Sequence, residues 1–186
     1  MQPTGGKDEP NRPPNARRVA PTPDGICYWR NNSYFYEDKT KEIMIRMFTP
    51  ADEDAVIKIW LDASKLAHDF VEPGFWENME EQVRTQMLPR LEVWVYDDDM
   101  TGEVVGFVSL NGNYVEALFV EPDRQGEGIG FQLMEQVKKK HREIELSVYK
   151  ENPASVAFYE RQGFVAVGES IEPQTGHPEW KMRFRM

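Results

Sequence analysis

Residues 118–130 read Leu-Phe-Val-Glu-Pro-Asp-Arg-Gln-Gly-Glu-Gly-Ile-Gly, and they carry the clearest structural signal of the chain. They pass from an apolar run typical of a β-strand, through a turn rich in glycine, into a predicted helix over about 128–141. Glycine lets a backbone approach a ligand without an intervening Cβ atom. The N–H groups of such a turn, backed by a helix dipole, form an anion site, and we expect a phosphate or pyrophosphate there.

Two common phosphate-binding motifs do not fit this turn. A nucleotide-hydrolase loop ends in Gly-Lys-Ser or Gly-Lys-Thr, and the chain contains neither sequence. A dinucleotide fingerprint needs a third glycine where the chain has Phe131, and it needs an early βαβ repeat that the element order does not supply. The spacing from Gln125 through Gly128 to Gly130 therefore indicates a different class of phosphate ligand.

The rest of the chain predicts strands and helices around this turn. Strands are expected over 43–47, 91–96, 104–110, 114–120, 144–148, 164–167 and 180–184. Helices are expected over about 50–67, 75–88, 128–141 and 153–161, with Thr49 as the first N-cap and Pro89 ending the second helix. This order predicts an α/β or α+β single domain with a mixed sheet.

A second motif follows the glycine turn, separated from it by one helix and one strand. Residues 152–164 read Asn-Pro-Ala-Ser-Val-Ala-Phe-Tyr-Glu-Arg-Gln-Gly-Phe. The loop from Gln125 to Gly130 resembles the acetyl-CoA pyrophosphate loop of the GNAT superfamily of N-acetyltransferases, and 152–164 resembles that family's second motif. The segment Ala67-His68-Asp69-Phe70, with other short stretches, is similar to a bacterial branch of the family, the YjaB-type acetyltransferases.

The resemblance implies a fold and a cofactor. It implies a GNAT-like single domain over 41–186, with a mixed, mostly antiparallel sheet of about seven strands flanked by four helices. It implies acetyl-CoA as cosubstrate and no metal, with the pantetheine arm along a splayed strand and the pyrophosphate on the loop. The cofactor-binding residues implied are Leu118, Phe119, Val120, Gln125, Gly126, Glu127, Gly128, Ile129, Gly130, Asn152 and Tyr159. Asn152 is equally suited to be the N-cap of the helix that follows it.

Three residues are candidates for the chemistry. Tyr159 is implied to donate a proton to the departing thiolate, and the alternative is a packing aromatic beside Phe158. Glu116 is implied to take a proton from the amine directly or through water, and the alternative is a solvent-facing strand position. His68, at the end of the first helix, is a candidate base or acceptor contact near neutral pH, or else a capping or core histidine. His177 is a weaker candidate of the same type.

The charge of the chain is acidic and unevenly distributed. The 186 residues include 22 Lys and Arg against 32 Asp and Glu, a net charge of −10, and residues 1–40 hold six of the basic and five of the acidic residues. The acidic excess therefore belongs to the body after residue 40, which argues against nucleic acid and weakly favours a cationic acceptor. The single cysteine, Cys27, excludes an intrachain disulfide and a multi-cysteine zinc site.

Residues 1–40 are expected to be a separate extension. Residues 1–23 hold six of the 13 prolines and few large apolar side chains, so we predict that they are disordered. The aromatic stretch 24–41 is interpreted as a docking segment or lid, or more simply as an irregular extension. Because the N-terminus lacks the apolar core of a signal peptide and no apolar run approaches a membrane span, we expect a cytoplasmic protein without a membrane partner.

The expected function is that of an acetyl-CoA-dependent N-acetyltransferase acting by direct transfer to an amine. A small-molecule amine is favoured over a protein lysine or N-terminus. The alternative from another class is a non-catalytic GNAT-fold module that binds or senses CoA esters. The sequence leaves open the acceptor, the choice of base among Glu116, His68 and water, and whether the chain forms a homodimer.

Overall fold

The computed structural model describes residues 17–18, 29–30, 44–72 and 74–186. The chain divides into two compact units, Met1–Glu42 and Ile43–Met186. In the first unit, the short strands β1 (Arg17–Arg18) and β2 (Trp29–Arg30) pair antiparallel. The prediction of disorder over 1–23 lies almost wholly outside the described residues, as does Cys27.

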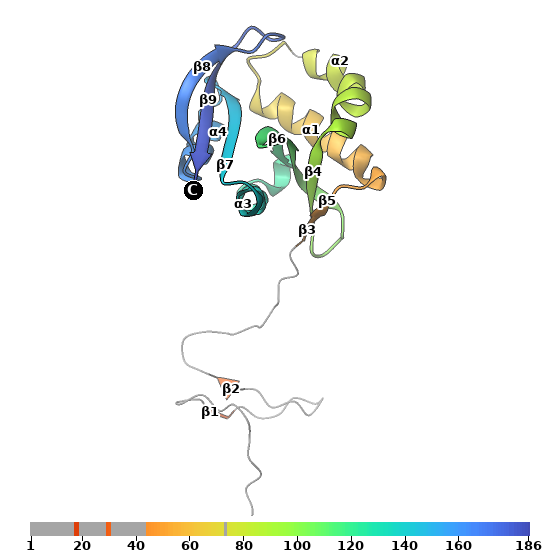
Figure 1. Ribbon diagram of the computed structural model, residues 1–186. Helices are drawn as coiled ribbons and strands as arrows, with labels where there is room; N and C mark the ends of the chain where they lie inside the picture. Colours follow the sequence, from red (N-terminus) through yellow and green to blue (C-terminus); the bar gives the residue numbers. More distant parts are fainter. Residues whose placement is uncertain (1–16, 19–28, 31–43, 73) are drawn as a thin grey trace, which may run out of the picture. The chain divides into compact units, whose positions relative to one another are not determined.

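The second unit is a mixed seven-stranded sheet with four α-helices (Figure 1). The strands are β3 (Ile45–Met47), β4 (Glu92–Asp97), β5 (Val104–Asn111), β6 (Tyr114–Val120), β7 (Glu143–Tyr149), β8 (Val165–Ile171) and β9 (Pro178–Arg185). The helices are α1 (Glu53–Ala67), α2 (Phe75–Gln82), α3 (Ile129–Lys140) and α4 (Pro153–Arg161). The spatial order is β3-β4-β5-β6-β7-β9-β8, and every neighbouring pair is antiparallel except β6 and β7. The predicted fold class is confirmed.

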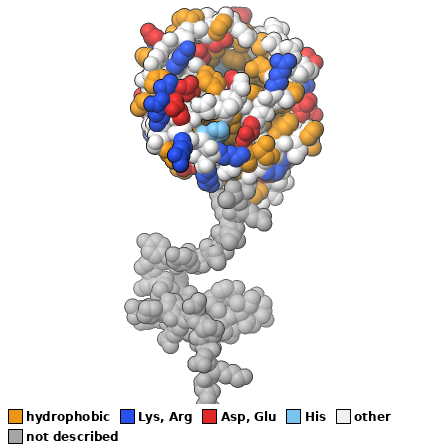
Figure 2. All heavy atoms as spheres, in the orientation of Figure 1, with side chains coloured by type: hydrophobic (Ala, Val, Ile, Leu, Met, Phe, Trp, Pro, Cys, Tyr) orange, Lys and Arg blue, Asp and Glu red, His pale blue; other side chains and the backbone are white. Residues whose placement is uncertain are grey.

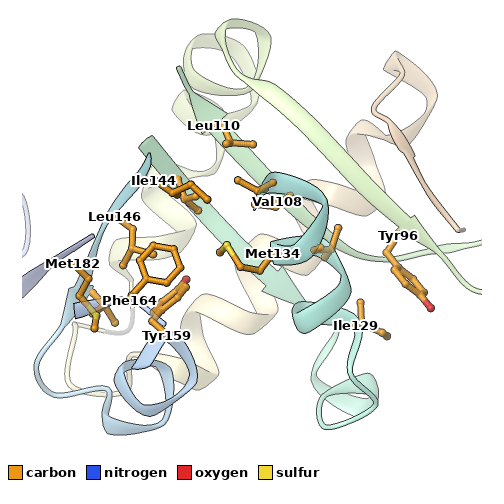
Figure 3. Close-up of a cluster of buried hydrophobic side chains, with 14 of the residues drawn as sticks. Tyr96, Val108, Leu110, Ile129, Met134, Ile144, Leu146, Tyr159, Phe164 and Met182 are labelled. Carbon is orange, nitrogen blue, oxygen red and sulfur yellow. The ribbon is translucent and has the colours of Figure 1, made fainter. Parts of the chain in front are cut away.

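Two hydrophobic clusters cover the two faces of the sheet. The first cluster joins the sheet to α3 and α4 through side chains that include Leu133, Met134 and Tyr159 (Figure 3). The second joins it to α1 and α2 through side chains that include Ile59 and Trp76. Strand β6 serves both clusters, because successive side chains of a strand point to opposite faces.

The pairing of β6 with β7 is short, and it shapes the site. Only Tyr114 with Glu145 and Val115 with Leu146 are in register between these parallel strands. On its other side, β6 stays paired with β5 up to Val120. From residue 116 onward β6 therefore diverges from β7, and the divergence of β7, β9 and β8 from the other strands is visible in Figure 1.

The helix predicted over 75–88 is less regular than expected. Its α-helical part ends at Gln82 and continues as a π-helical turn over Val83–Met87 and a 3₁₀ turn over Leu88–Arg90. The Thr85 hydroxyl donates to the Glu81 carbonyl oxygen at 2.7 Å, which competes with the regular backbone bond. Pro89 has no N–H to offer to the carbonyl of Thr85, so the chain cannot complete a final α-helical turn.

Close packing of α3 on the sheet depends on a glycine in β5. A Cβ atom on Gly106 would lie 3.0 Å from Ile129 Cγ2 and 3.2 Å from the Phe119 carbonyl oxygen. The absent side chain lets the first turn of α3 approach β5 and β6. That turn begins directly after the glycine loop, so this contact also fixes the position of the loop.

We predict that Gly106→Ala lowers the free energy of unfolding by about 1–3 kcal/mol, because the added methyl group overpacks a filled site. Urea denaturation measures this change. Gly168→Ala is the matched control, since a Cβ atom there meets nothing within 4 Å and its backbone is not strained. It should stay within about 0.5 kcal/mol of the wild type. Equal stability of the two variants would contradict the packing argument.

Candidate active site

The loop before α3 presents its backbone toward solvent. Gly126 and Gly128 both have φ of 84°, a conformation that side-chain-bearing residues rarely adopt. Residues 125–128 are exposed, and α3 makes its first backbone bond from Gln132 N–H to the Gly128 carbonyl at 3.1 Å. The N–H groups of residues 129–131 therefore have no acceptor within the helix. The loop offers several N–H donors at the positive end of a helix dipole, as the sequence predicted.

Ionic contacts hold this loop in place. Arg124 pairs with Asp98 at 2.5 Å and with Glu127 at 3.0 Å. Asp98 lies in the turn between β4 and β5, where it also accepts from the N–H groups of Met100 and Thr101. The Thr101 N–H and the Arg124 guanidinium together lower the pKa of Asp98 to about 2. Arg124 thus offsets one of the two negative charges of Asp98 and Glu127 beside the loop.

The last residues of β6 have a free edge toward β7. Leu118 and Val120 pack against the first cluster, while Phe119 packs against the second. Their backbones pair with β5 on one side only, because the β6–β7 register ends at Val115. The side-chain amide of Gln125 donates to the Val120 carbonyl at 3.2 Å, which closes the loop onto the strand. A 3₁₀ turn over Pro122–Arg124 connects the free edge to the loop.

Tyr159 lies in the first cluster, on α4. Its side chain is 9% exposed and contacts the rings of Phe158 and Phe164 edge-on (Figure 3). Burial raises its pKa, and the nearby Tyr114 hydroxyl raises it further. The phenol therefore stays protonated and is available as a donor. Tyr159 packs in the core, and its role as a proton donor stays a prediction.

Asn152 takes its structural role. Its side chain is buried and its Oδ1 accepts from the Ser155 N–H at 3.0 Å, which caps α4. Its N–H donates to the Tyr149 carbonyl at 3.1 Å, and its own carbonyl accepts from Val156. Only the side-chain NH₂ group of Asn152 is available to contact a cofactor, and that contact stays a prediction.

Glu116 occupies a β-bulge. Leu110 pairs with Val115 and Ser109 pairs with Ala117, so Glu116 is the extra residue of β6. Its side chain is exposed, at the point where β6 leaves β7. Alternation along the strand did not settle which way it faces, because the bulge interrupts the alternation.

Tyr114 is a residue that sequence reasoning missed. Burial raises the pKa of its phenol, a hydrogen bond with Ser147 opposes this, and the charges of Glu179 and Glu116 raise it again. The pKa of the Tyr114 phenol therefore depends on Ser147, Glu179 and Glu116, and Tyr114 in turn raises the pKa of Tyr159. No motif marks Tyr114, because its neighbours come from three strands and one helix.

His68 lies in an aromatic contact set that we call the aromatic bridge, made of His68, Phe70, Tyr149 and His177. His68 is 5.0 Å from Tyr149 and 5.8 Å from Phe70 between ring centres, and Phe70 is 4.9 Å from His177. Burial lowers the pKa of His68 to about 4. Such an imidazole is neutral near pH 7 but a weak base, which favours the packing interpretation. The Nδ1 atom of His177 forms a hydrogen bond with Oε2 of Glu151 at 2.6 Å.

Comparison with known proteins now decides the family. A sequence profile for the acetyltransferase (GNAT) domain matches residues 51–185. The chain belongs to the GNAT family. It is 33% identical to the peptidyl-lysine N-acetyltransferase YiaC of Escherichia coli K12 over 140 residues, covering 75% of this chain and 94% of YiaC. It is 31% identical to the peptidyl-lysine N-acetyltransferase YjaB of the same strain, covering 73% of this chain and 91% of YjaB.

Solved structures of the GNAT family agree with this assignment. The solution structure of apo YjaB from Escherichia coli superposes with a TM-score of 0.67 at 27% identity, covering 75% of this chain and 95% of YjaB. The PaiA N-acetyltransferase of Thermoplasma acidophilum, solved with coenzyme A, shares the fold with a TM-score of 0.62 at 18% identity, covering 76% and 98%. The resemblance to the GNAT family and its YjaB-type branch is confirmed, and the protein is an N-acetyltransferase.

In the described part of the chain, no three His, Cys, Asp or Glu side chains are grouped to hold a metal ion. None of the described helices has the length and apolar character that crossing a bilayer requires.

We predict that Gly128→Ala weakens acetyl-CoA binding about tenfold. An alanine at φ of 84° is strained by about 1–2 kcal/mol, and relieving that strain turns the loop N–H groups away from the phosphates. Isothermal titration calorimetry measures the dissociation constant.

Gly112→Ala is the matched control. Gly112 has φ of 63° in the hairpin between β5 and β6, far along the chain from the loop, and nothing lies within 4 Å of an added Cβ atom. The Gly112→Ala variant carries the same kind of backbone strain but should leave acetyl-CoA affinity unchanged. Equal acetyl-CoA affinities of the two variants would contradict the assignment of the loop to the binding site.

Proposed function

We propose that this GNAT-family enzyme transfers the acetyl group of acetyl-CoA directly to the side-chain amine of a lysine in a polypeptide. The observation that supports acetyl-CoA as the cofactor is the free edge of β6 together with the N–H groups at the start of α3 that have no acceptor within the helix. The acceptor class rests on relatives named as peptidyl-lysine N-acetyltransferases, of which the chain covers more than nine-tenths. The small-molecule acceptor expected from the sequence remains the alternative. A cytoplasmic location and a homodimer also stay predictions.

The residues present fit acetyl-CoA. The N–H groups of residues 126–131 suit the pyrophosphate, and the positive φ of Gly126 and Gly128 keeps side chains out of its way. The free edge of β6 suits an amide-bearing pantetheine arm, which hydrogen-bonds to a strand as another strand does. Little side-chain charge is needed, which agrees with an acidic chain binding a polyanion.

Direct transfer needs a base and an acid. The amine nitrogen must lose a proton and form a bond to the acetyl carbon, while the carbon–sulfur bond breaks and the sulfur gains a proton. We assign the acid role to Tyr159, whose raised pKa keeps its phenol protonated. We assign the base role to Glu116, acting through water, because it is exposed where β6 leaves β7. His68 is a poorer base, since burial lowers its pKa to about 4.

We predict that Tyr159→Phe lowers the turnover number about 10²-fold and leaves the acetyl-CoA dissociation constant within a factor of two. The expected loss follows from removing a general acid while the ring continues to pack. Release of free CoA thiol, followed with a thiol reagent, measures turnover on a blocked lysine peptide.

Tyr96→Phe is the control for this variant. It also removes a hydroxyl from a buried tyrosine, whose only recorded side-chain bond in the described chain is to Gln132 at 3.4 Å. It should leave turnover nearly unchanged. Equal turnover of the wild type and Tyr159→Phe would contradict the acid role of Tyr159. If the protein binds acetyl-CoA but releases no CoA thiol with any amine, the non-catalytic sensing module is favoured.

A further inference from the structure

We infer that a cavity on the face of the C-terminal strands, beside the point where β6 and β7 diverge, receives the acceptor lysine side chain, with Glu179 binding its ammonium group. This inference rests on the proposed function and names the residues that recognise its acceptor. The cavity measures about 460 Å³ and is lined by Tyr114, Glu145, Ser147, Glu179, Lys181 and Arg183 among others.

The cavity lies on the sheet face opposite α3 and α4. Ile144, Leu146 and Val148 of β7 point into the first cluster, so Glu145 and Ser147 point the other way. Across the β7–β9 ladder, Glu145 stands opposite Arg183 and Ser147 opposite Lys181. The next alternate pair is Tyr149 with Glu179, where Tyr149 belongs to the aromatic bridge. The cavity floor is therefore a row of register pairs that ends at the aromatic bridge.

The charges of the cavity leave one carboxylate available. Arg183 pairs with Glu145 at 2.6 Å and lies 3.4 Å from Glu143, so these charges satisfy one another. Glu179 forms no ion pair in the described part of the chain, and its closest polar partner is Ser170 Oγ at 3.5 Å. Burial and the neighbouring Glu172 raise its pKa, although Lys181 opposes this. A half-buried carboxylate that forms no ion pair is stabilised by a cation that enters the cavity.

The lining of the cavity includes Tyr114, two residues before Glu116 on β6. Burial raises the pKa of the Tyr114 phenol, and the charges of Glu179 and Glu116 raise it further. Tyr159 itself packs in the first cluster, on the α4 side of the sheet.

The walls suit the stem of a lysine. Val167 and Ile171 of β8 line the cavity and are 50% and 61% exposed, which leaves apolar surface at its outer side. A lysine has a long apolar stem and a charged head, so the methylene groups pack on these side chains while the ammonium reaches Glu179. On the face shown in Figure 2, acidic and basic side chains are mixed.

The test is steady-state acetylation of a short peptide with blocked ends and one internal lysine, at low ionic strength. Glu179→Gln keeps the size of the side chain and removes its charge. We expect KM for the peptide to rise about tenfold or more, with the acetyl-CoA dissociation constant and the melting temperature unchanged. Lys181→Met should act in the opposite direction and lower KM about two- to fivefold, because Lys181 competes with the ligand for Glu179.

Glu169→Gln is the matched control. Glu169 lies on β8 opposite Trp180 and pairs with Lys150, outside the cavity lining. It should change neither KM nor turnover. If Glu179→Gln keeps KM within twofold while the wild type acetylates the peptide, the cavity assignment is overturned and the proposed function stands. If the wild type acetylates spermidine but not the peptide, the lysine acceptor is overturned. Absence of acetyl-CoA binding would overturn the proposed function as well.

Discussion

The parallel contact between β6 and β7 is limited to two register pairs, and the functional architecture depends on that limit. Backbone groups of a buried strand need hydrogen-bond partners, so an early end to pairing leaves a free edge that a ligand can complete. The bulge at Glu116 falls at this end, where it breaks the alternation of β6. A fully paired sheet would be more regular, but it would present no main-chain edge beside the glycine loop.

Both sides of the divergence are held by contacts outside the sheet. On one face, α3 and α4 fill the first cluster, and Gly106 allows the close approach of α3. On the other face, the aromatic bridge joins the loop after α1 to the end of β7 and the start of β9. The two halves of the sheet diverge but keep a fixed relative position, because side-chain packing replaces the missing backbone hydrogen bonds between β6 and β7.

The net negative charge of the chain is compatible with a phosphate ligand at the glycine loop. The glycine loop provides dipoles rather than side-chain charges, so an excess of carboxylates does not oppose a phosphate ligand there. Most carboxylates near the loop and in the strands are paired, as Asp98 and Glu127 are with Arg124 and Glu145 is with Arg183. Net charge therefore says less about recognition than a half-buried carboxylate such as Glu179, which forms no ion pair in the described chain.

The sequence alone determined the elements, the glycine loop and the family, because helices, strands and turns follow from local periodicity and from glycine and proline. It erred at the ends of elements, where the helix expected over 75–88 loses its α-helical form after Gln82 and the strand expected over 164–167 runs from Val165 to Ile171. The candidates Tyr159, Asn152 and Glu116 were named from motifs that are contiguous in the chain. Only the tertiary structure decided what surrounds them. Tyr114 meets Glu179 across the sheet, and His68 is buried among aromatic rings, since strand pairing and packing join residues that local sequence does not relate.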